Sequence, residues 1–212
     1  FHGKDAILSG PAGGIVGAAR AAASAGIDKI IAFDMGGTST DVGLIRDGVP
    51  QVSAELELEY AMPIHVPMVD VHTIGAGGGS IAAIGEDGLL HVGPRSAGAM
   101  PGPICYRRGG TEPTITDANL VLGFYDPGFF LGGRMTLDRR AALKAVGRLG
   151  EEIGLSAVEA AYGIHKVVTE SMAAAARIHL VEKGKDPRAY AMVGFGGAGP
   201  ARSGCVRCGS CM

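Results

Sequence analysis

The chain has no tryptophan, no long apolar run and no cluster of basic residues. No stretch approaches the roughly 18 uninterrupted apolar residues that a membrane-spanning helix needs. The N-terminal residues lack the charged-then-apolar layout of a signal peptide, so we expect a cytoplasmic protein without a membrane partner. With a formal net charge of −2 and no run of Lys or Arg, the chain also lacks the basic surface that nucleic acid attracts. We therefore expect no nucleic-acid partner.

Cysteine is scarce, with four in the chain, and three of them are Cys205, Cys208 and Cys211. A disulfide framework is not expected in a chain of this size and type. Thiolates at this spacing suit zinc or an iron–sulfur cluster, but structural zinc sites are almost always four-coordinate and no fourth ligand lies nearby. We favour a disordered or non-native tail over a metal site for residues 201–212.

Glycine, by contrast, is abundant, with 36 residues in a chain of 212. The usual share is about 7%. Because glycine has no Cβ, its backbone adopts positive φ and can approach a ligand closely, so clusters of glycine are candidate phosphate loops. An ordinary turn remains the alternative for any single glycine.

The pattern of apolar and turn residues predicts a chain that mixes helices and strands. Small residues from 12 to 25 favour a helix, which Ser9-Gly10-Pro11 would open. Two later helices are expected, one capped by Asp138 and one opened by a capping box of Ser156 and Glu159. Residues 93–113 are rich in proline and glycine and predict an ordered loop. Strands are expected at 29–33, 42–45, 51–60, 69–74, 81–84, 89–92 and 190–195.

The turn from Asp34 to Asp41 is the strongest candidate site. Backbone N–H groups around Gly36 and Gly37 can form a nest that binds an anion, and three hydroxyl groups follow at Thr38, Ser39 and Thr40. Asp34 can hold Mg²⁺ through the ion's water ligands, because Mg²⁺ commonly binds one or two carboxylates together with substrate phosphates. A Gly-Gly hairpin turn with a polar rim is the structural alternative.

A second glycine loop follows at 75–80. The Walker-type phosphate loop is excluded because no lysine follows the glycines of either loop. The dinucleotide fingerprint also fails, since its sixth position is Ser80 and a strand is expected beyond it. Gly77 and Gly78 are therefore candidates for a loop beside a phosphate, with a tight bend as the alternative.

Two further groups of polar residues are weaker candidates. Asp70 and His72 lie two apart on an expected strand and so share one face, where they could ligate a metal or act as acid and base. A structural pair is the favoured interpretation. Thr116, Asp117 and Asn119 are typical of a helix cap, although they could also reach into a substrate cleft.

The glycine motifs resemble those of known ATPases. FDMGGTSTDVGLI resembles the second phosphate loop of the actin-like ATPase superfamily, which includes sugar kinases and chaperones, and GFGGAGP at 194–200 resembles its adenosine loop. Six motifs in order resemble the hydantoinase A and 5-oxoprolinase family, which also contains subunits of acetone-type carboxylases. They are SGPAGG, FDMGGTSTDV, HTIGAGGGSIA, GPRSAGAMPGPICY, PTITDANLVLG and GFGGAGP, and the similarity covers nearly all of residues 5–200.

The resemblance implies an α/β lobe of the ribonuclease H-like, actin-type ATPase fold, with an antiparallel meander in a mixed sheet and flanking helices. It also implies an enzyme that uses ATP and Mg²⁺ to activate a small cyclic amide, hydantoin or 5-oxoproline, before hydrolysis of the ring. Residues Gly36 to Thr40 would hold the β- and γ-phosphates, and Asp34 and Asp41 would organise Mg²⁺ and the attacking group. Gly196, Gly197 and Gly199 would lie against the adenosine.

The resemblance also bears on what surrounds this chain. Family members carry an earlier lobe with its own phosphate loop, and none precedes Phe1, so we expect residues 1–200 to be the second nucleotide-binding lobe of a longer chain. A hydantoinase B-type subunit or domain is the expected partner. The alternatives are a nucleotide-binding or interaction module that is inactive alone and a subunit of an ATP-dependent ketone carboxylase. A sugar kinase or chaperone relative is disfavoured, because those proteins lack the string at 93–113.

Overall fold

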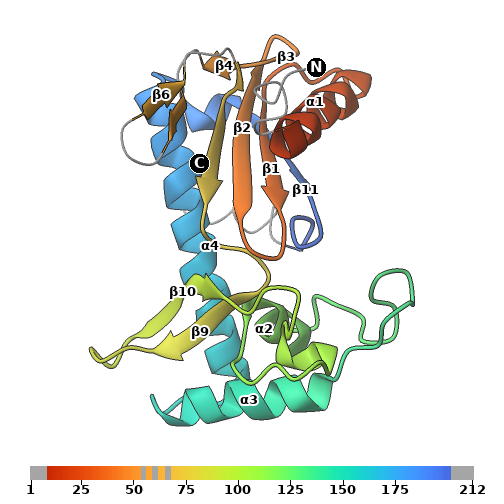
Figure 1. The fold of residues 1–212 in the computed structure, drawn as a ribbon, viewed down its shortest axis with the longest axis vertical. Helices are drawn as coiled ribbons and strands as arrows, with labels where there is room; N and C mark the ends of the chain where they lie inside the picture. Colours follow the sequence, from red (N-terminus) through yellow and green to blue (C-terminus); the bar gives the residue numbers. More distant parts are fainter. Residues whose placement is uncertain (1–8, 54–55, 59–61, 65–67, 202–212) are drawn as a thin grey trace.

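The computed structural model describes residues 9–53, 56–58, 62–64 and 68–201. Its mixed sheet has the order β11-β1-β2-β3, and β8 pairs with the same β2 (Figure 1). Strand β11 runs parallel to β1, while the other pairs are antiparallel. The predicted mixed sheet with an antiparallel meander is therefore confirmed. These strands are β1 (Ile30–Met35), β2 (Thr40–Arg46), β3 (Val49–Pro50), β8 (Val71–Ile74) and β11 (Ala191–Phe195).

Helix α1 (Ser9–Ser24) packs on one face of this sheet. Successive side chains of β1 point to opposite faces of the sheet. Ile30 and Ala32 therefore join the apolar cluster under α1, and Ile31 and Phe33 join the cluster that includes α4. The approach of α1 is close, since a Cβ on Gly43 would lie 2.3 Å from a methyl of Ile15. The predicted helix of small residues is confirmed, and its small side chains allow this close packing.

Below the sheet, a second group of elements surrounds the lower half of α4 (Ala157–Glu182), which runs through both parts of the molecule (Figure 1). The capping boxes at Ser156 and Thr114 and the Asp138 cap satisfy the first N–H groups of three helices. None of the described helices is long and apolar enough to cross a membrane. The group comprises β9 (Ser80–Ile84), β10 (Leu90–Ser96), the 3₁₀ turn η2 (Ile104–Tyr106), α2 (Ile115–Val121) and α3 (Arg139–Glu151).

The predicted strand at 51–60 is described only in part, and the predicted strand at 69–74 is interrupted at Asp70. The described part of the first is two short strands, β4 (Val52–Ser53) and β5 (Leu56–Leu58), which pair with β7 (Met68–Val69) and β6 (Met62–Ile64). The second changes partner at Asp70, because β7 pairs with β4 whereas β8 pairs with β2. Each strand follows its pairing partner, which periodicity alone does not reveal.

Two other boundaries differ from expectation. Strand β10 continues to Ser96, and η2 lies inside the segment predicted as a loop, which is otherwise irregular. The cap of α2 is Thr114, so Thr116 lies within the first helical turn. A final 3₁₀ turn, η3 (Pro187–Ala189), precedes β11. The cysteine tail predicted at 201–212 lies outside the described residues from position 202 onward.

Arg107, in the segment rich in proline and glycine, has a strained backbone conformation whose cost can be measured. Its φ of 60° and ψ of 32° lie in the left-handed region, which costs a non-glycine residue roughly 1–2 kcal/mol. Its ion pair with Asp138 is 3.6 Å long and exposed, and it contributes little. We therefore expect Arg107→Gly to raise the free energy of unfolding in urea by about 0.5–1 kcal/mol, after the entropic cost of glycine.

The matched control is Arg140→Gly, which replaces an exposed arginine on a regular helix, α3. There the same substitution should lower stability by about 1 kcal/mol. If both variants lose stability to the same extent, the strain at Arg107 is absent.

Candidate functional site

The turn between β1 and β2 is closed by its own backbone. The N–H of Gly36 donates to the carbonyl of Ser39 at 3.0 Å, and the hydroxyl of the buried Thr40 donates to the carbonyl of Ala76 at 2.6 Å. Among the described residues, the backbone N–H groups of Gly37 and Thr38 and the hydroxyl of Thr38 have no hydrogen-bond partner. The tip of the turn therefore presents donors that are free to bind an anion.

The second glycine loop packs directly against this turn. Gly78 N–H donates to the carbonyl of Gly36 at 3.0 Å, and Gly79 N–H donates to that of Gly37 at 2.6 Å. A Cβ on Gly77 would lie 2.6 Å from backbone atoms of Gly37 and Thr38. Only glycine permits this approach. Strand β9 follows the loop, in agreement with the exclusion of a dinucleotide fingerprint.

Asp34 and Asp41 face each other across the β1–β2 ladder. The Thr73 hydroxyl, on the neighbouring β8, donates to Asp41 Oδ1 at 2.6 Å. Burial, and then the nearby charge of Asp41, raise the pKa of Asp34 above its ordinary value. No lysine or arginine of the described chain forms an ion pair with either carboxylate. The pair therefore lacks a counter-charge, and a divalent cation would supply one.

The loop after β11 lies against the end of β1. Ala198 N–H donates to the carbonyl of Met35 at 2.9 Å. Gly196 has a φ of 82°, and a Cβ there would lie 2.3 Å from Oδ1 of Asp34. A Cβ on Gly199 would lie 1.9 Å from the carbonyl oxygen of Phe195. The parallel pairing of β11 with β1 thus brings this loop beside the phosphate turn, although Gly36 and Gly196 are 160 positions apart in the sequence.

A cavity of about 670 Å³ opens between the glycine loops and the lower part of the molecule. The turn at 36–38, Gly78 and Gly79, and Gly197 and Ala198 contribute to its lining, together with Thr116. The other predicted site residues of these loops do not contribute to the lining, namely Asp34, Ser39, Thr40, Asp41, Gly77, Gly196 and Gly199. The opposite wall is largely aromatic, with Tyr106, Phe124, Tyr125, Phe129 and Phe130.

Sequence reasoning missed this aromatic wall. The chain has only 11 Phe and Tyr residues, 6 and 5, so four of them between positions 124 and 130 form a local concentration that could have marked the segment. Arg108 and Asp126 are the charged residues of the lining. Asp126 accepts the N–H of Gly128 at 2.8 Å, whereas no hydrogen bond or ion pair engages Arg108 within the described part of the chain. The cavity thus offers an aromatic wall beside the free N–H donors of Gly37 and Thr38 and the unpaired guanidinium of Arg108.

Asp70 and His72 do not line this cavity and lie where β8 contacts α4. Asp70 forms an ion pair with Lys183, and its Oδ2 is 3.9 Å from Nε2 of His179. The ring of His72 stacks on that of His179, with 5.2 Å between centroids. No group of three or more His, Cys, Asp or Glu side chains in the described ranges is placed to hold a metal ion. Both residues thus contact α4 rather than each other.

His179 makes the stability of this cluster depend on pH. Its side chain is buried and its Nε2 has no hydrogen-bond partner, and burial lowers its pKa below 6.5, outweighing the opposite effect of Asp70. The unfolded chain therefore binds a proton at a higher pH than the folded chain does, so stability falls as pH decreases below 6.5. We expect urea unfolding at pH 7.5 and 5.5 to show a smaller loss for His179→Gln than for the wild type. An equal loss in both proteins would contradict this account.

Thr116, Asp117 and Asn119 have separate roles in the structure. Asp117 is buried and accepts the N–H groups of Thr114 and Cys105 at 2.9 and 2.8 Å. Asn119 Oδ1 is 3.1 Å from Nδ1 of the buried His165. Only Thr116 contributes to the cavity lining. Asp117 belongs to the capping box of α2, but the N-cap is Thr114, so the predicted cap is wrong in position, and Thr116 lines the cavity with the glycine loops.

Comparison with known proteins identifies the family. A family model described as hydantoinase/oxoprolinase matches residues 1–206. The chain belongs to this family. It is 48% identical over 196 residues to the caprolactamase subunit alpha of Pseudomonas jessenii, covering 92% of this chain and 28% of that protein. It is also 40% identical to 5-oxoprolinase 1 of Arabidopsis thaliana, covering 94% of this chain and 17% of that protein.

Solved structures of this family share the fold. The nucleotide-free structure of acetone carboxylase matches with a TM-score of 0.85 and 32% identity, over 96% of this chain and 29% of that one. The crystal structure of ATP-dependent caprolactamase from Pseudomonas jessenii matches with a TM-score of 0.80 and 45% identity, over 93% and 28%. The predicted actin-type ATPase fold is therefore confirmed. The chain spans less than a third of the length of each of these proteins.

Proposed function

We propose that residues 1–200 form the second nucleotide-binding lobe of an ATP-dependent enzyme that hydrolyses a cyclic amide. The observation that carries the proposal is the convergence of three glycine loops, from positions 36–38, 77–79 and 196–199, on one end of the sheet. Their free N–H groups at Gly37 and Thr38 suit the β- and γ-phosphates. The relatives named as 5-oxoprolinase and ATP-dependent caprolactamase support a cyclic amide as the second substrate.

Asp34 is the residue that would hold Mg²⁺, through water, with Asp41 beside it. The two carboxylates lie side by side without a cation, which fits a divalent ion bound jointly with phosphates. The ion would offset the negative charge of the phosphates. The turn at 36–38 would orient the terminal phosphate by hydrogen bonds, and Gly197, which lines the cavity, would lie against the adenosine. Gly196 and Gly199 would hold this loop close to Asp34 and Phe195.

The chemistry follows from the low reactivity of an amide carbonyl. Its oxygen attacks the terminal phosphorus, an O–P bond forms, and the bond to ADP breaks with the electron pair leaving on ADP. One water then adds to the activated carbon, and the ring C–N bond breaks with its electron pair and a proton on nitrogen. The acyl phosphate that remains is hydrolysed by a second water to a carboxylate and phosphate. Since phosphoryl transfer depends mainly on positioning and charge, the glycine loops and the free guanidinium of Arg108 are the relevant groups in this chain.

The test is turnover by the complete protein together with its partner subunit. We expect release of ADP only in the presence of a cyclic amide, with one ADP formed for each ring opened. Hydantoin, 5-oxoproline and caprolactam are the compounds to compare. Absence of ATP-dependent ring opening with all of them would overturn the proposal.

A second candidate is an ATP-dependent ketone carboxylase, which the similarity to acetone carboxylase favours. The same assay separates the two, because incorporation of labelled bicarbonate into a ketone without ring opening would support carboxylation. By itself the lobe is proposed to be inactive, since the first phosphate loop is expected on another part of the complete chain.

A further inference from the structure

Thr116 connects the lower part of the molecule to the phosphate turn. It is 4% exposed, and both its backbone N–H and its hydroxyl donate to the carbonyl of Gly78 at 2.8 Å. The peptide that carries this carbonyl also carries the N–H of Gly79, which donates to Gly37 at 2.6 Å. A peptide whose carbonyl accepts two hydrogen bonds is polarised and becomes a stronger donor at its N–H. Thr116 therefore acts on the phosphate turn through one peptide group.

Thr116 is itself held in place by the residues around helix α2. Asp117, the next residue, accepts the N–H groups of Thr114, Cys105 and Ile104 at 2.9, 2.8 and 3.2 Å. Helix α2 is buried along its whole length and packs on α3 and α4. Since α2 cannot shift easily, the position of Thr116 determines where the loop at 77–79 lies, and that loop determines where Gly36 and Gly37 lie.

We propose that Thr116 is a positioning residue that holds the turn at Gly36 to Thr38 in its phosphate-binding form. The proposal rests on the nucleotide role given above to this turn. Without the Thr116 hydroxyl, one of the two bonds to Gly78 is lost and the peptide between Gly78 and Gly79 is free to tilt. The donors at Gly37 and Thr38 would then no longer converge on the phosphates, and a small displacement of such groups has a large effect on binding and rate.

The experiment compares Thr116→Val and Thr116→Ser in the complete protein. Valine keeps the shape and the backbone bond but removes the hydroxyl, whereas serine restores it. We expect Thr116→Val to raise the Kd for a Mg²⁺ complex of a non-hydrolysable ATP analogue about tenfold or more, and Thr116→Ser to remain within about threefold of the wild type. The KM for the cyclic amide should change less than the KM for ATP.

Thr169→Val is the matched control. Thr169 is 5% exposed, its hydroxyl donates to the carbonyl of His165 within α4 at 2.7 Å, and it does not line the cavity. This variant should lose a similar amount of thermal stability without any change in the Kd for the ATP analogue. If Thr169→Val and Thr116→Val weaken nucleotide binding equally, Thr116 has only a structural role and the proposal is wrong.

Hydrogen exchange measured without nucleotide tests the positioning role of Thr116 independently of the proposed function. We expect faster amide exchange at residues 36–39 in Thr116→Val than in the wild type, with unchanged exchange in α3. Unchanged exchange at 36–39 would overturn the positioning role. The wild type could instead neither bind ATP nor open any ring while the variant still exchanges faster. In that case the proposed function is wrong, but the positioning of residues 36–39 by Thr116 stands.

Discussion

Replacing Gly77 by alanine should weaken binding of Mg²⁺–ATP to the complete protein by about 100-fold. The added Cβ would lie 2.6 Å from the carbonyl carbon of Gly37 and the nitrogen of Thr38, and 2.7 Å from the oxygen of Gly37. All three atoms belong to the backbone, so no side chain can rotate away to make room. The phosphate turn itself must shift, and its N–H donors shift with it.

Gly75→Ala is the control for this substitution, two positions earlier in the same loop. A Cβ at Gly75 meets no atom within 4 Å, so nucleotide binding should change by less than about threefold. Calorimetric titration of both variants, with thermal unfolding measured alongside, separates a displaced loop from a misfolded protein. Comparable affinities for the two folded variants would show that the contact between the glycine loops does not position the phosphates.

Asp34→Asn should have opposite effects on activity and on stability. Loss of the carboxylate should lower ATP-dependent turnover by about 10–100-fold and raise the Mg²⁺ concentration needed for half-maximal rate, as removal of an outer ligand does. The pKa of Asp34 is raised in the folded protein, so its negative charge at neutral pH disfavours folding. The neutral amide removes the cost of burying this charge and the repulsion between it and Asp41, and we expect a higher Tm without Mg²⁺.

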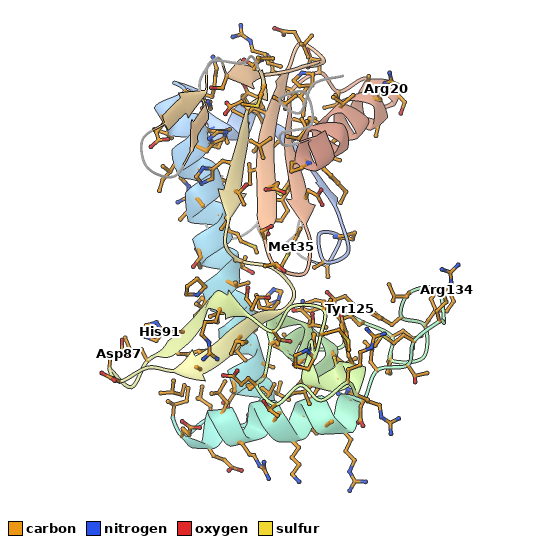
Figure 2. All side chains as sticks on the ribbon, viewed as in Figure 1. Arg20, Met35, Asp87, His91, Tyr125 and Arg134 are labelled. Carbon is orange, nitrogen blue, oxygen red and sulfur yellow. The ribbon has the colours of Figure 1, made fainter. Side chains whose placement is uncertain are left out.

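The matched change is Asp87→Asn at the tip of the β9–β10 hairpin, where the carboxylate accepts the N–H of Leu89 and contacts His91 (Figure 2). These contacts lower the pKa of Asp87, so its removal should not stabilise the protein. Turnover should be unaffected. An Asp34→Asn protein with normal Mg²⁺ dependence would remove Asp34 from the metal site.

Features that depend on neighbouring residues were predictable from the sequence. The caps at Asp138 and Ser156 and the box with Glu159 are hydrogen bonds across three positions, and the structure has all of them. The β9–β10 hairpin and the turn after β1 follow from alternating apolar residues around turn residues. Local chemistry alone determines these elements.

Features that depend on distant pairing were not predictable. The break at Asp70 reflects a change of strand partner, and its carboxylate is paired with Lys183, 113 positions later. The bond from Thr116 to Gly78 spans 38 positions, and no spacing rule links a helix turn to a glycine loop. The aromatic wall is an intermediate case, because the four residues at 124–130 are concentrated in the sequence whereas Tyr106 joins them only in the folded cavity.

Hydrogen exchange of the complete protein with and without a saturating Mg²⁺ complex of a non-hydrolysable ATP analogue tests the central claim most directly. The central claim is that the three glycine loops of this chain bind the nucleotide. We expect slower exchange at residues 36–39, 77–79 and 196–199, and no change on the outer face of α3. Saturation of the protein without slower exchange at any of these loops would contradict the claim and place the nucleotide elsewhere.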